Sequence, residues 1–170
     1  MLTTVPWGPP LGVGFGRPRK QRNFSLNHSA SQPRSFAALA LILIHLVISM
    51  VHGTAHQGAM VGLTAFGNVY VIVVITLAPL VAAVLLFTRR QKPAALLLAL
   101  SMFGSFIFGF WYHFLSSTND NVTEVHGPWH SRFLWTAIAL AAIELAGTFV
   151  GLRIYRLRSS SPLRETGMSG

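Results

Sequence analysis

The chain has 170 residues, of which 52% are hydrophobic and only 10% are charged, whereas about a quarter are charged in an ordinary soluble domain. This composition argues against a soluble single domain and, for most of the chain, against intrinsic disorder. The absence of cysteine excludes disulfides, thiolate metal sites and a cysteine nucleophile.

The chain begins with a proline- and arginine-rich segment over residues 1–35, which is typical of a disordered basic tail. Four apolar segments follow, and each is long enough for a membrane span, which takes about 20 mostly apolar residues. We expect these spans at residues 36–56, 63–87, 94–115 and 132–155. The predicted fold class is therefore an all-α integral membrane protein, a four-transmembrane-helix bundle, with a short tail after residue 155.

Two local features bear on how the spans are shaped and packed. Pro79 predicts a kink inside the second span because proline lacks an N–H and its ring clashes with the preceding turn. Gly147 and Gly151 stand four residues apart in the fourth span, a spacing that favours close approach of a neighbouring helix.

The basic residues predict the orientation in the membrane. All but Arg132 fall before the first span, between the second and third, or after the fourth, and an even number of spans places these segments on one side. They are Arg17, Arg19, Lys20, Arg22, Arg34, Arg89, Arg90, Lys92, Arg153, Arg156, Arg158 and Arg164. Since lysine and arginine accumulate on the cytoplasmic side, both termini are predicted to be cytoplasmic, in a plasma (inner) membrane.

The net charge of +9 is thus explained by topology and by attraction to anionic lipid headgroups. Nucleic acid is not expected as a partner. The partners that the sequence suggests are the lipid bilayer and either another membrane protein or a second copy of the chain.

Histidines gather on the side opposite to the basic residues. The first span carries His45, His52 and His56, which fall within about 40° of one another around a helix. Ionisable residues inside a span nearly always face the bundle interior or a cavity. The stripe is therefore predicted to be the inward face of the first helix.

The pattern His-Gly-x-x-His occurs twice, at His52–His56 and at His126–His130, and His113 ends the third span. A pair four residues apart brings two imidazoles to one side of a helix, as metal-binding helices require. Imidazole suits copper, zinc and iron. The candidate ligands of haem b or of a divalent transition metal are His52, His56, His113, His126 and His130, with Asp120 and Glu124 as candidates for supporting or additional ligands.

Glu144 is the one carboxylate inside a span. It lies about 13 Å from the inner end of its helix, and His45 lies about 16 Å from the same side. A charged carboxylate at this depth costs several kcal/mol unless it is paired. We therefore predict a buried His45–Glu144 pair, which serves either helix register or function.

Three functions remain open from the sequence. The first is a histidine-rich site at the outer face that binds haem or a transition metal in a redox or metal-handling role. The second is a non-catalytic accessory or assembly subunit of a membrane complex. The third is a proton-linked small-molecule membrane protein that uses the intramembrane ionisable residues. The sequence leaves open whether the protein is an enzyme.

Overall fold

The computed structural model describes residues 32–160, and the predicted tails therefore lie mostly outside the described residues. Within this range the chain folds into helices and connecting loops, without strands. The elements in chain order are α1 (Gln32–Gly58), α2 (Ala65–Tyr70), η1 (Val71–Leu77), α3 (Ala78–Leu86), α4 (Gln91–Phe110), η2 (Trp111–Leu115), η3 (Gly127–Trp129) and α5 (His130–Ser159).

These elements form four continuous helical rods that are long and apolar enough to cross a membrane, as the sequence predicts. The rods cover Arg34–Gly58, Ala65–Leu86, Gln91–Leu115 and Gly127–Ser159. The third and fourth rods are longer than expected, because helix begins before Ala94 and continues beyond Tyr155.

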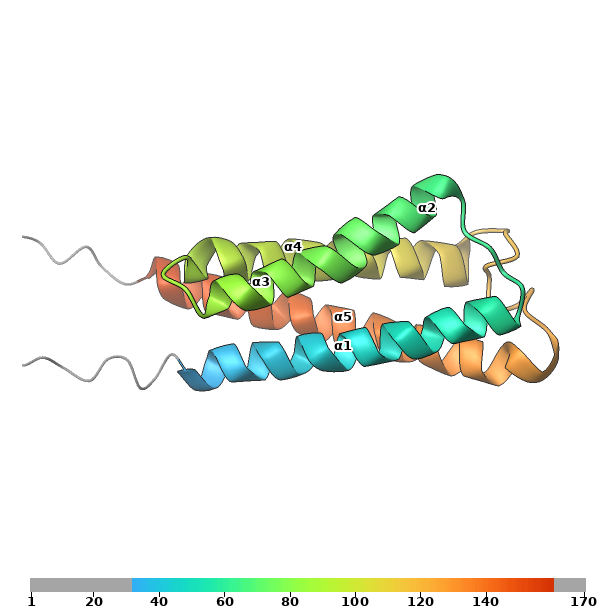
Figure 1. The fold of residues 1–170 in the computed structure, drawn as a ribbon, viewed down its shortest axis with the longest axis horizontal. Helices are drawn as coiled ribbons and strands as arrows, with labels where there is room; N and C mark the ends of the chain where they lie inside the picture. The colour runs from blue at the N-terminus through green and yellow to red at the C-terminus, as the bar shows by residue number, and fades with distance from the viewer. Residues whose placement is uncertain (1–31, 161–170) are drawn as a thin grey trace, which may run out of the picture.

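The rods lie side by side with alternating direction (Figure 1). One end of the bundle, here called the terminal end, carries the start of α1, the α3–α4 turn and the end of α5. The opposite end, here called the loop end, carries the loops over residues 59–64 and 116–126. Helix α5 packs against both α4 and α1, and α3 packs against α4 and α1. Toward the loop end, α2 diverges from α1.

The bundle is held by a tight apolar core near the terminal end. Ala38 and Ile42 of α1 meet Leu86 of α3 and Leu98 and Met102 of α4, all fully buried. The outward faces are also apolar. Exposed side chains include Leu43, Val47, Val84 and Phe149. A bundle that is apolar on its outside as well as its inside matches a lipid environment.

The irregularity expected at Pro79 takes the form of a π-helical segment, η1, directly before the proline. The N–H of Ala78 donates to the carbonyl of Val73, five residues earlier, and the hydroxyl of Thr76 donates to the carbonyl of Val71 at 3.0 Å. A second π segment, η2, ends the third rod. Such π turns are frequent at functional sites, and the sequence did not predict this one.

Gly151 of α5 lies directly against the backbone of α4. A Cβ atom at this position would stand 2.7 Å from the backbone nitrogen of Ala99 and 2.9 Å from the carbonyl oxygen of Ala95. Because backbone atoms cannot move aside as a flexible side chain can, only glycine permits this approach. The close helix approach predicted from Gly147 and Gly151 is therefore found at the α4–α5 contact.

The Gly151→Ala variant is expected to unfold more easily than the wild type, by about 1–3 kcal/mol, because the added methyl overpacks the α4–α5 contact. Gly53→Ala is the matched control, since nothing lies within 4 Å of a Cβ placed there. The control should be neutral or more stable by up to about 1 kcal/mol, from helix propensity alone. Thermal unfolding in detergent measures the stability of both variants. An equal loss of stability in the two would contradict the close backbone contact of α4 and α5 at Gly151.

Candidate metal centre

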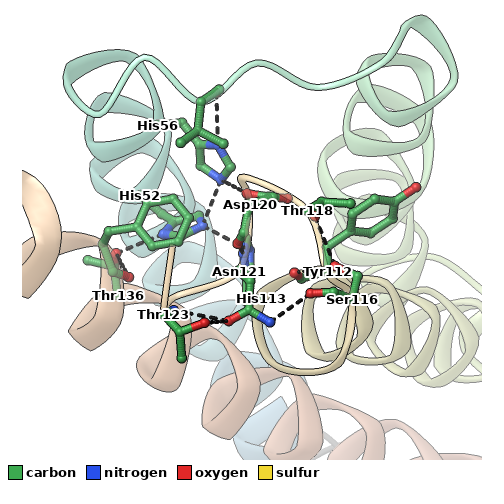
Figure 2. A network of polar contacts seen from close by, with 12 residues as sticks. His52, His56, Tyr112, His113, Ser116, Thr118, Asp120, Asn121, Thr123 and Thr136 are labelled. Atoms are coloured by element: carbon green, nitrogen blue, oxygen red, sulfur yellow. Dashed lines mark hydrogen bonds and ion pairs between the residues drawn. The ribbon is translucent and has the colours of Figure 1, made fainter. Parts of the chain in front are cut away.

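Three histidines meet inside the bundle near its loop end, and Figure 2 shows them from close by. The Nε2 atoms of His52 and His113 are 3.1 Å apart, and those of His56 and His52 are also 3.1 Å apart. One nitrogen from each of the three rings lies within 4.8 Å of the others, an arrangement that could hold a metal ion. We call this group the histidine triad.

Two of the three rings come from one helix. His52 and His56 lie one turn apart on α1 and present their rings to the same side. His113 comes from η2, the π segment at the end of the third rod. The buried ring of Phe133 on α5 packs against all three imidazoles, with centroid distances of 5.0 Å to His52, 4.8 Å to His56 and 5.2 Å to His113. One side of the triad is therefore covered by an apolar aromatic ring.

The opposite nitrogen of each ring is held by an oxygen of the protein. The Nδ1 atom of His56 lies 3.3 Å from the carbonyl oxygen of Val61, and that of His113 lies 3.0 Å from the carbonyl oxygen of Asp120. A carbonyl oxygen only accepts, so both Nδ1 atoms carry the proton. Metal-binding histidines are oriented by this same kind of hydrogen bond.

Thr136 of α5 fixes the third ring in the same way. Its hydroxyl donates to the carbonyl of Arg132, at 2.6 Å, and thus has no further proton to give. With the hydroxyl proton on the Arg132 carbonyl, the Nδ1 atom of His52, 2.8 Å from this hydroxyl oxygen, is the donor. When all three rings are neutral and carry the proton on Nδ1, each Nε2 atom presents a lone pair.

These three lone pairs face one another inside the bundle, which is unfavourable without a positive charge between them. A single proton that bridges His52 and His113 engages the lone pairs of those two rings, and it leaves the Nε2 lone pair of His56 without a bridging proton of its own. A metal cation accepts all three lone pairs at once. The donor set thus matches a metal ion better than a shared proton.

Asp120 places a carboxylate beside the triad. Its Oδ1 atom lies 3.4 Å from Nε2 of His56 and 3.4 Å from Nδ1 of His113. The residue is only 5% exposed, and neither carboxylate oxygen has a hydrogen-bond partner within the described part of the chain. A buried carboxylate without hydrogen bonds is costly, and a metal cation at the triad would offset that cost.

The loop that carries Asp120 is fastened to the end of the third rod. The side-chain amide of Asn121 donates to the carbonyl of Ser116 at 2.7 Å, and the N–H of Val122 donates to the carbonyl of His113 at 2.9 Å. The same loop therefore positions His113 through the Asp120 carbonyl and presents the Asp120 carboxylate. Figure 2 shows this loop folded over the triad.

The remaining site residues named from the sequence lie outside the triad. Glu124 and His126 are exposed. His130, at the start of α5, is partly buried and its Nδ1 donates to the carbonyl of Val125 at 2.7 Å. In the described range neither His126 nor His130 joins a group of three ligating side chains. The second His-Gly-x-x-His pair starts a helix rather than lying along one, so its rings are not stacked one turn apart.

His45 and Glu144 meet at mid-depth, below the triad. The Nε2 atom of His45 lies 3.3 Å from Oε1 of Glu144, and both side chains are almost fully buried. The pair joins α1 to α5. The Nδ1 atom of His45 has no hydrogen-bond partner within the described residues.

A cavity of about 440 Å³ connects these two sites. All three triad histidines and Asp120 line it near the loop end, and Glu144 lines it at mid-depth. One side of the triad is therefore open to space inside the bundle.

Sequence reasoning missed Thr136 and Phe133, which orient and shield the triad. Neither residue type signals metal binding. Their position three residues apart on α5 places both on the face toward α1, which becomes informative only once the neighbouring helix is known.

Comparison of the chain with known protein families, with curated proteins and with solved structures finds no match. What the site can do is therefore argued from its own geometry.

The Thr136→Val variant is expected to lose about 1–3 kcal/mol of stability, because the buried Nδ1–H of His52 loses its acceptor. Thr148→Val is the matched control on the same helix. The Thr148 hydroxyl also donates to the carbonyl four residues earlier, that of Glu144, but among the described residues it accepts no hydrogen bond from another helix. Chemical denaturation in detergent compares the two. Similar stability of both variants would contradict the role assigned to Thr136.

Proposed function

We propose that the protein is an integral membrane protein that binds one divalent transition metal ion through Nε2 of His52, His56 and His113. The observation that carries this proposal is that each Nδ1 atom lies within hydrogen-bond distance of a protein oxygen, while the three Nε2 atoms converge. Asp120 supplies the nearby negative charge that a divalent ion needs in an apolar surrounding.

The spacing of the nitrogens supports one small ion. With metal–nitrogen bonds of about 2.0–2.1 Å, two ligands are about 2.9 Å apart at right angles and about 3.3 Å apart at tetrahedral angles. The separations of His52 from His56 and from His113, 3.1 Å each, lie between these values, and all three nitrogens lie within 4.8 Å of one another. Zinc, copper and iron all accept imidazole in such a set.

Haem is less well supported by the same distances. Two imidazoles on opposite sides of one iron are about 4 Å apart, since each bond is about 2 Å long. The Nε2 atoms of His52 and His113 are closer than that, and Phe133 packs directly against both rings. We therefore favour a mononuclear ion.

The site has the form of a reactive centre rather than a structural one. Structural metal sites are closed by four protein ligands, whereas catalytic sites use three and keep one position open. Here three histidines stand beside a cavity. An ion held there would polarise an oxygen atom of a bound molecule, or exchange an electron with it.

We place the centre at the extracytoplasmic side of a plasma (inner) membrane. The loop end carries Arg132, whereas the terminal end carries Arg34, the basic α3–α4 turn and the arginines that end α5. The positive-inside rule assigns the terminal end, and with it both termini, to the cytoplasm.

Purified in mild detergent and stripped of metal, the protein should bind one Zn²⁺ or Cu²⁺ per chain. Replacing any one of His52, His56 and His113 by alanine should weaken this binding by about a hundredfold or more, because only two ligands remain. His126→Ala and His130→Ala are the controls and should bind as the wild type does.

Calorimetric titration and elemental analysis measure this binding. Equal metal affinity in the triad variants and the controls would contradict the assignment of His52, His56 and His113 as the ligands. A reduced-minus-oxidised spectrum of protein made with ample haem serves as the alternative readout, since a Soret band and an α band would assign haem instead.

The orientation is tested by single cysteines, which this cysteine-free chain allows without background. Asn119→Cys at the loop end and Ser160→Cys at the terminal end both occupy exposed positions. A membrane-impermeant maleimide added to intact cells should label Asn119→Cys, and it should label Ser160→Cys only after the membrane is opened. The reverse pattern would overturn the proposed topology.

A further inference from the structure

The cavity beside the triad extends well beyond what a metal ion needs. Along α5 it is lined from Ala137 to Glu144. Seven residues of helix correspond to about 10 Å. Its volume of about 440 Å³ falls within the range of about 300–1,000 Å³ that is usual for small-molecule sites.

The long walls of the cavity are mostly apolar and come from three rods. Val71 and Ile75 of η1 form one side, Phe108 of α4 forms another, and Leu140 and Ala141 of α5 form the third. A molecule that fills this space must therefore itself be largely apolar.

The mid-depth end of the cavity is polar and incompletely hydrogen-bonded. The hydroxyl oxygen of Ser49 on α1 is buried and has no partner among the described residues. Glu144 uses Oε1 toward His45, and no hydrogen bond to its second carboxylate oxygen is found in the described part of the chain. A free donor and a free acceptor thus face the same space, and buried polar groups of this kind are normally satisfied.

A single hydroxyl group can satisfy both, because it donates one hydrogen bond and accepts another. A cation would fit less well, because Glu144 already has His45 as its partner, and a second positive charge at this depth would lack a counter-charge.

We propose that this cavity binds a lipid-soluble molecule that carries a hydroxyl group, with the hydroxyl between Glu144 and Ser49 and the apolar body along η1 and α5. The groups assigned to the hydroxyl, Glu144 and Ser49, are separate from the three histidines of the triad.

The test uses a long-chain phenol that carries a photoreactive diazirine, with metal-free full-length protein in lipid nanodiscs. Labelling should saturate, and peptide mapping should place it on the cavity walls. The unlabelled phenol should compete at least about tenfold better than its methyl ether, because the ether has lost the donor to Glu144.

Two variants separate the cavity from the lipid-facing surface. Ala141→Phe fills the cavity and should reduce saturable labelling at least about tenfold. Ala142→Phe is the matched control, because Ala142 is the next residue of α5 and is exposed; it should label as the wild type does. Ile75→Phe obstructs the cavity from the opposite wall, which keeps the test decisive if Ala141→Phe does not fold.

Labelling that rises linearly without saturation, or that is equal in Ala141→Phe, Ile75→Phe and Ala142→Phe, would overturn the proposal and show that the space holds only acyl chains or water. Equal competition by the phenol and the methyl ether would also overturn it. Zinc titration of Ala141→Phe, run in parallel, is expected to match the wild type, so a failure of the metal site and a failure of the ligand site give different results.

Discussion

The arrangement of the site depends on one constraint, namely that a buried imidazole nitrogen without a partner is costly. In this bundle the three Nδ1 atoms are satisfied by Val61, Asp120 and Thr136, which belong to three different parts of the chain. That choice forces the three Nε2 lone pairs toward one point. The tautomers assigned to the rings and the proposed affinity for a cation both follow from it.

The irregular parts of the structure serve this same arrangement. The π segment η2 carries His113, and the loop after it returns to bond the backbone and the ring of His113 while it carries Asp120. The regular core lies near the other end, where small residues and Gly151 bring α4 and α5 together. Rigid packing at one end thus supports a polar, open site at the other.

The sequence predicts the four rods well, because the length and apolar character of each segment can be read along the chain without knowledge of tertiary contacts. It also places His52 and His56 on one face, since helical periodicity is local. It could not exclude His126, because whether His-Gly-x-x-His lies along a helix or starts one depends on the turn around Gly127, whose φ is positive. The roles of Thr136 and the carbonyl of Val61 require tertiary contacts that no local pattern encodes.

Helix α1 carries His45, Ser49, His52 and His56 on a single stripe, so one rigid element serves the mid-depth pair, the cavity and the triad. A rotation of α1 about its own axis would turn all four side chains together, away from Glu144 and from His113 at the same time. A translation of α1 along that axis would likewise shift His45 relative to Glu144, and His52 relative to His113, by the same distance. One helix thus carries side chains of both polar sites, and within the described residues no chain of hydrogen bonds joins the two.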